Sequence, residues 1–66
     1  MNRYRFRLAS AGATVGQLEF LADPKVSSSW IVLTGNDLTE AQARLMSVSH
    51  GMVCGLRVKL ADMALV

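Results

Sequence analysis

The chain has one cysteine and one histidine in 66 residues, and this scarcity limits how its fold can be stabilised. A domain of this size buries only about 60% of the surface that its unfolded chain exposes. Small domains usually add disulfides, a metal or a partner chain to a core that contributes roughly 3 to 5 kcal/mol. One cysteine cannot form an internal disulfide, and one cysteine with one histidine falls short of the four ligands of a structural zinc. A partner chain is therefore the expected supplement.

The composition also favours a partner chain, because hydrophobic residues make up 52% of a sequence with little interior to hide them. The longest uncharged runs, such as residues 45–56, are too short to cross a membrane. The basic residues near the start are not followed by the apolar segment of a signal peptide. We therefore expect no membrane contact, a cytoplasmic location and a reduced thiol.

Two segments alternate with the period of a half-buried strand. Residues 3–8, RYRFRL, have arginines on one side and apolar residues on the other. Residues 17–22 alternate again, and the two segments are expected to form a hairpin in which Glu19 faces an arginine. Residues 30–34, WIVLT, are apolar on both sides, which predicts a central strand covered on both faces.

Residues 39–51 predict the best-defined element, an amphipathic helix. Thr39 and Gln42 have the spacing of a capping box, and Glu40 lies four residues before Arg44. Gly51 is placed to end the helix. Apolar residues at steps of three and four predict the face that packs on the core: Leu38, Ala41, Leu45, Val48 and Met52.

Residues 54–60 predict a last strand, with Cys54 on its buried side and Arg57 and Lys59 in solvent. The apolar tail, residues 61–66, is expected to add an edge strand or to contact another chain. The order β-β-β-α-β predicts one small α+β domain, residues 1–66, with a mainly antiparallel sheet of about four strands and one helix packed on one face.

His50 and Cys54 are the pair that most suggests chemistry, and both lie in the segment SHGMVCG, residues 49–55. At the end of a helix the macrodipole disfavours a thiolate. Helical geometry directs His50 toward solvent, whereas Cys54 shares the buried side of the expected strand. The sequence also has no serine elbow, phosphate-binding loop or paired carboxylates at a useful spacing. We therefore expect no enzyme activity, no catalytic or metal-binding residue and no cofactor.

Binding is the expected function. Arg3, Arg5 and Arg7 would stand about 7 Å apart on one strand face. Further candidates are the basic residues of the expected last strand, one flank of the helix and the apolar C-terminal tail. The candidate partner-binding residues are Arg3, Arg5, Arg7, Arg57, Lys59, Met46, His50, Met63 and Leu65.

Our first hypothesis is a small non-enzymatic protein-binding module that forms a homodimer and regulates or inhibits a larger macromolecular partner by contact. In size and layout it is similar, in general terms, to small accessory proteins of bacteria and phages. The alternative is a nucleic-acid-binding protein that uses the strand face of Arg3, Arg5 and Arg7.

Overall fold

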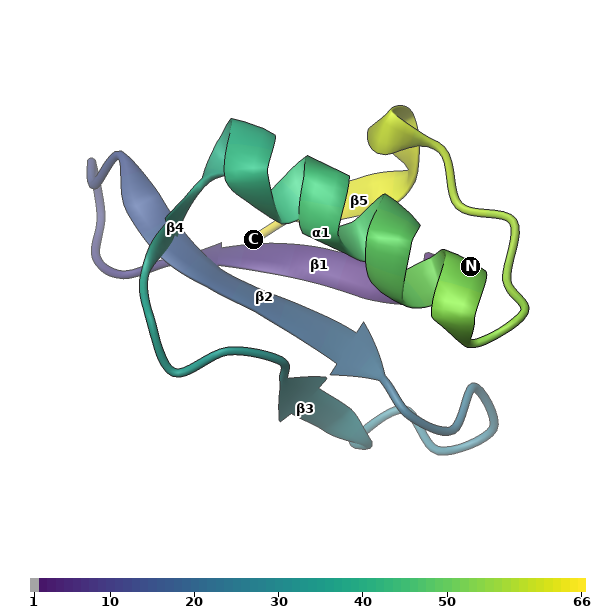
Figure 1. Cartoon of the computed structure of the whole chain (residues 1–66). Helices are drawn as coiled ribbons and strands as arrows, with labels where there is room; N and C mark the ends of the chain where they lie inside the picture. Colours follow the sequence, from purple (N-terminus) through teal and green to yellow (C-terminus); the bar gives the residue numbers. More distant parts are fainter. Residues whose placement is uncertain (1) are drawn as a thin grey trace.

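One helix packs against a mixed sheet of five strands in the computed structural model, which describes residues 2–66 (Figure 1). The strands are β1 (Tyr4–Leu8), β2 (Val15–Leu21), β3 (Trp30–Val32), β4 (Leu38–Thr39) and β5 (Met63–Leu65). The helix α1 is Glu40–Val53, and a turn of 3-10 helix, η1 (Leu60–Asp62), precedes β5. The order along the sheet is β3-β2-β1-β5, with β4 also paired to β2. The predicted α+β class is confirmed, with one helix on a sheet that is mostly antiparallel.

The predicted hairpin of β1 and β2 is present, and its register places Tyr4 opposite Phe20 and Arg5 opposite Glu19. Neighbours directly across an antiparallel pair point to the same side of the sheet. The aromatic side chains therefore lie on the helix side, in the core, and the charged pair lies on the other side. The core contains Tyr4, Phe6, Leu18, Phe20, Ala43 and Met63.

The prediction that residues 30–34 form a covered central strand is wrong. β3 is three residues long and pairs only with β2 within the described chain, so it is an edge strand. Ile31 and Val32 are each 48% exposed. The apolar composition of a strand indicates burial only where the chain is long enough to supply a second layer, and one helix cannot cover this edge.

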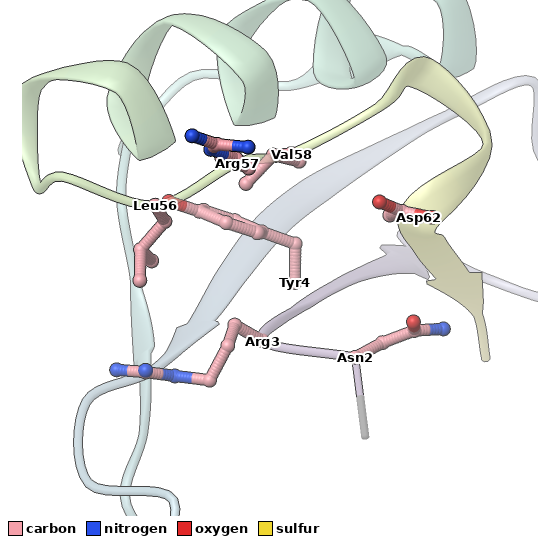
Figure 2. A pocket seen from close by; sticks show the side chains of 7 residues that line it. All are labelled: Asn2, Arg3, Tyr4, Leu56, Arg57, Val58 and Asp62. Carbon is pink, nitrogen blue, oxygen red and sulfur yellow. The ribbon is translucent and has the colours of Figure 1, made fainter.

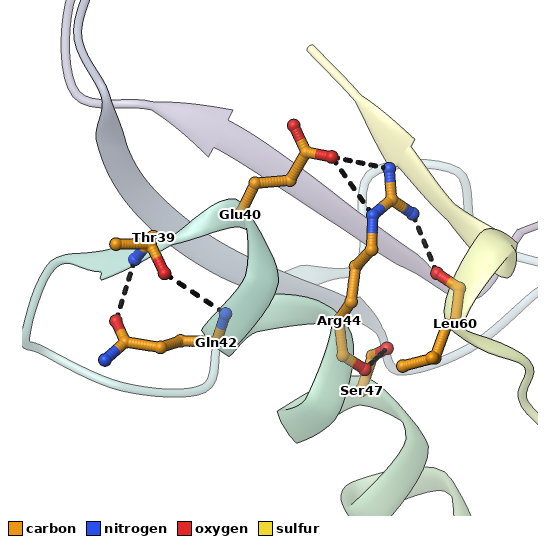
Figure 3. A network of polar contacts seen from close by, with 6 residues as sticks. All are labelled: Thr39, Glu40, Gln42, Arg44, Ser47 and Leu60. Carbon is orange, nitrogen blue, oxygen red and sulfur yellow. Dashed lines mark hydrogen bonds and ion pairs between the residues drawn. The ribbon is translucent and has the colours of Figure 1, made fainter.

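The start of α1 is as predicted, but its end is not. Thr39 and Gln42 form the capping box, with N···O distances of 2.9 and 3.2 Å (Figure 3). The helix continues past Gly51 to Val53, and Gly55, at φ 75°, is the residue that terminates it. The N–H of Leu56 donates to the carbonyl of Gly51, the Schellman pattern of a helix end.

The face of α1 that packs on the sheet is opposite to the predicted one. Ala43, Ser47 and Gly51 are buried, whereas Leu45 is 64% and Met52 73% exposed. Small side chains let the helix lie close to the sheet, because the large aromatic residues of β1 and β2 already fill the space between the layers. A Cβ on Gly51 would lie 2.4 Å from Cγ2 of Val58, which shows how close this packing is.

Residues 54–60 do not form the last strand that their alternation predicts. The chain instead leaves the helix, passes through η1 and enters β5, which pairs in parallel with β1. The C-terminal tail thus supplies an edge strand, one of the two outcomes expected of it. Cys54 is exposed rather than buried, because no strand directs it inward.

Candidate functional site

The outward side of α1 carries an apolar surface, which we call the outer helix face and define as Ala41, Leu45, Val48 and Met52. Their spacing of four, three and four residues keeps all four side chains on one side of the helix. Leu45 and Met52 are among the most exposed large apolar residues of the described chain. None of the four residues is charged, and Gln42 and Ser49 border them on one side. These residues therefore form an uncharged apolar strip on the side of the helix that faces away from the sheet.

Arg44 borders the outer helix face on its other side and is held there by three bonds. Its guanidinium donates to the carboxylate of Glu40 at 2.9 and 3.1 Å and to the carbonyl oxygen of Leu60 at 2.8 Å (Figure 3). The predicted pair of Glu40 and Arg44 is therefore present and also connects the helix to η1. Leu60, which is half exposed, adds apolar surface beside Arg44.

The arginines of β1 share one acid on the sheet side away from the helix. The carboxylate of Glu19 lies 2.5 Å from Nε of Arg5 and 3.4 Å from Nε of Arg7. The guanidinium of Arg5 also stacks over the ring of Trp30, 4.1 Å from its centroid. Glu19 is 9% exposed, so its charge offsets the two guanidinium charges at short range. The signal for this pairing, Glu19 opposite an arginine, was readable in the sequence.

The other basic candidates lie apart from Arg5 and Arg7. Nε of Arg3 donates to the carbonyl oxygen of Leu21 at 2.8 Å. Arg3 and Arg57 line a hollow of about 160 Å³ together with Tyr4 and Asp62 (Figure 2). Arg57 and Lys59 are exposed, as expected, but they lie in a loop and not on the predicted last strand, so they do not extend the face of Arg5 and Arg7.

His50 and Cys54 are placed the other way round from the prediction. The His50 ring turns inward, and its Nδ1 lies 2.7 Å from the hydroxyl of Tyr4. Cys54 lies on the surface, with Sγ 3.7 Å from Nδ1 and 3.9 Å from Nε2 of His50. The reversal occurs because α1 packs on the sheet with the side opposite to the predicted one. His50 lies next to Ala43 and Ser47 on that buried side. The nitrogen nearest the thiol is thus already hydrogen-bonded to Tyr4.

The environment of this cluster affects the phenol of Tyr4. Burial raises the pKa of Tyr4 above its ordinary value, the charge of Cys54 raises it further, and Arg3 lowers it. Tyr4 therefore remains a neutral hydrogen-bonding group at physiological pH. Within residues 2–66, no three His, Cys, Asp or Glu side chains come together in a way that could hold a metal ion.

The remaining candidates differ in how accessible they are. Met46 is half-buried and packs against the core, and Met63 is fully inside it. Met63 is therefore not available to a partner, contrary to its place among the predicted binding residues. Leu65 is exposed and lines a hollow of about 220 Å³ at the end of β1.

The apolar stripe predicted that the outer helix face packs on the core, because an apolar stripe on a helix usually does so. A second pattern in the same helix predicts the opposite orientation. Ala43, Ser47 and Gly51 are small residues at steps of four, and a stripe of small residues is typical of a helix side that lies close to another element.

No helix described in residues 2–66 has the length and apolarity needed to cross a membrane. Comparison with protein-family models, with curated proteins and with solved structures finds no significant match to this chain. Function is therefore inferred from the geometry alone.

Proposed function

We propose that this protein is a small non-enzymatic module that binds protein by contact, and that the outer helix face is its docking surface. The observation that supports this most is the exposure of Leu45 and Met52 on the same side of a well-capped helix. Burying a leucine or methionine contributes about 1.5 to 3 kcal/mol. The fitting partner is an apolar helix or groove of a protein, because the surface carries no charge for an ionic ligand to pair with.

A protein partner is favoured over nucleic acid by the state of the arginines. Binding to a phosphate backbone needs several free cationic side chains, since each neutralised phosphate adds to the affinity. On the sheet, Arg5 and Arg7 already share Glu19, and Arg3 is bonded to main-chain carbonyls. A phosphate would have to compete with a carboxylate that is largely shielded from solvent.

Photo-crosslinking from the outer helix face tests the proposal. Replacing Leu45 with the photoreactive residue benzoylphenylalanine should give protein adducts in native cells, and nuclease treatment should not remove them. Unlabelled wild-type protein in excess should suppress the adduct, while a Leu45→Glu competitor should not. The same photoreactive residue at Ser27, an exposed loop position, is the matched control.

Two results would contradict the proposal. The first is equal crosslinking from positions 45 and 27, which would mean that the helix has no special role. The second is a mobility shift of single-stranded RNA at low salt that is lost when Arg5 and Arg7 are changed to alanine, with no protein adduct at position 45.

A further inference from the structure

We infer that the occupant of the outer helix face is a second copy of this chain, with the two α1 helices packed antiparallel about a two-fold axis. This inference rests on the proposed function, because it names the partner of the same surface. A face that binds its own copy must be complementary to itself, and three features of α1 meet that condition.

The first feature is the spacing of the apolar residues. Steps of four, three and four residues are the repeat of a coiled-coil seam, which two helices bury against each other. A two-fold axis between residues 46 and 47 brings Ala41 opposite Met52 of the second copy, and Leu45 opposite its Val48. Each layer then combines a smaller with a larger side chain, so the two helices stay evenly spaced. A parallel pair would place two alanines in one layer and two methionines in another.

The second feature is the charge at the two ends of the helix. Asp37 is exposed just before α1, and Arg57 is exposed just after it. An antiparallel pair sets the acidic end of one helix near the basic end of the other, and this attraction acts through solvent because Arg57 itself lines the hollow beside Tyr4. A parallel pair would bring like charges together. The two helix dipoles are also opposed only in the antiparallel arrangement.

The third feature is the polar border of the face. Gln42 and Ser49 are uncharged and exposed on one side. On the other side, Arg44 is already bonded to Glu40 and to the carbonyl oxygen of Leu60, so its charge does not point freely at a second copy. Two copies can therefore approach without bringing an unpaired charge into the seam.

The small size of the surface favours a weak, reversible contact. A standard interface takes about 800 Å² from each partner, and the chain exposes 4315 Å² in all. The helix of 14 residues is about 21 Å long, so its seam with Leu60 is smaller than a standard interface. We therefore expect a reversible dimer that dissociates in the micromolar range.

Sedimentation equilibrium across micromolar to millimolar protein tests the dimer. The wild type should approach twice the 7.2 kDa mass of one chain. Leu45→Glu and Met52→Glu should each weaken association by at least about tenfold, with unchanged circular dichroism. Val26→Glu, which adds the same charge at an exposed apolar position of the loop between β2 and β3, should leave association unchanged.

Disulfide trapping tests the orientation. Cys54 is the only cysteine and is exposed, so a Cys54→Ser background provides a cysteine-free chain. Mixing Ala41→Cys and Met52→Cys chains in that background should give the mixed disulfide in excess over both symmetric ones. Mass spectrometry separates the three products because the two chains differ in mass.

The outcomes separate this inference from the proposed function. A wild type that stays monomeric at millimolar concentration, while position 45 still crosslinks to another protein, overturns the second copy and leaves the docking surface in place. A dimer that is insensitive to Leu45→Glu, or symmetric disulfides in excess, also overturns the inference. A monomer that gives no adduct from position 45 removes both.

Discussion

The hydroxyl of Tyr4 lies 2.7 Å from Nδ1 of His50, which ties the first strand to the last turn of the helix. In neutral imidazole the phenol donates to Nδ1, and we assign the remaining proton to Nε2. The His50 ring also meets the rings of Tyr4 and Phe20 edge to face, with centroids 5.6 and 4.8 Å apart. These three side chains connect the helix to the sheet at the C-terminal end of α1, next to Gly55.

Tyr4→Phe removes the hydroxyl and keeps the ring, so it isolates this hydrogen bond. We expect the free energy of unfolding in urea to fall by about 0.5 to 1.5 kcal/mol, because Nδ1 of His50 loses its partner in a partly buried place. Ser49→Ala, which removes an exposed hydroxyl from the same helix, should change it by less than about 0.5 kcal/mol. Equal effects of the two substitutions would show that the bond adds no stability.

The same phenol should make stability fall at high pH. Burial is the main cause that raises the pKa of Tyr4 above 10.0, so the folded chain holds the proton more tightly than the unfolded chain. This contribution is complete below pH 10.0 and declines as the pH rises through the folded-state pKa. Tyr4 is the only tyrosine, so tyrosinate absorbance reports it directly. The alkaline loss should be smaller in Tyr4→Phe, and a phenol that titrates at or below its ordinary pKa would contradict the prediction.

Glu19→Gln should destabilise the sheet and leave two unneutralised guanidinium groups on it. Because Arg5 and Arg7 both use this carboxylate, we expect a loss of about 1.5 to 3 kcal/mol in urea unfolding. Fluorescence of Trp30, the only tryptophan, should also change as the guanidinium of Arg5 moves.

The matched control for that change is Glu40→Gln, which removes an exposed carboxylate from a single pair on the helix. It should cost less than about 0.5 kcal/mol. Low-salt binding to single-stranded RNA should increase for Glu19→Gln relative to both the wild type and Glu40→Gln. An equal loss of stability in the two variants would mean that Glu19 is no more important than a surface carboxylate.

Gly51→Ala should destabilise the protein although alanine favours a helix by about 1 kcal/mol over glycine. The added Cβ would lie 2.4 Å from Cγ2 of Val58, and such overpacking costs about 1 to 3 kcal/mol. Val58→Ala in the same chain should recover most of the loss, since it removes the methyl groups concerned. Gly55→Ala, at φ 75° with open space around it, should be destabilising through backbone strain and should not be rescued by Val58→Ala. If Val58→Ala rescued both variants, overpacking at Gly51 and backbone strain at Gly55 would not be separate causes.

Local rules predicted those parts of the fold in which neighbours in sequence interact. The capping box of Thr39 and Gln42, and the hairpin that sets Arg5 against Glu19, depend on spacing and alternation within short segments, and both are present. They could be read from the sequence because no distant residue has to be known.

The features that were predicted wrongly depend on how the helix packs against the sheet. A stripe containing Leu45 and one containing Ala43 both run along α1, and only the volume of the aromatic side chains on β1 and β2 decides which one fits against the sheet. That volume is a property of the packed layers. The same choice decides whether His50 points inward. The strand predicted from the alternation of residues 54–60 is absent because residues 63–65 form the parallel partner of β1 instead.

The orientation of α1 is tested by two substitutions with opposite expectations. Ala43 is fully buried and Leu45 is 64% exposed, so Ala43→Leu should cost about 1 to 3 kcal/mol through overpacking, while Leu45→Ala should change stability by less than about 0.5 kcal/mol. Ala41→Leu makes the same chemical change as Ala43→Leu but on the outer helix face, so its effect on stability should be as small as that of Leu45→Ala. Urea unfolding at submicromolar protein, well below the expected dissociation constant of the dimer, keeps association from contributing. If Leu45 were a core residue, as the apolar stripe alone predicts, Leu45→Ala would cost about 2 to 5 kcal/mol, and that result would reverse the orientation of the helix.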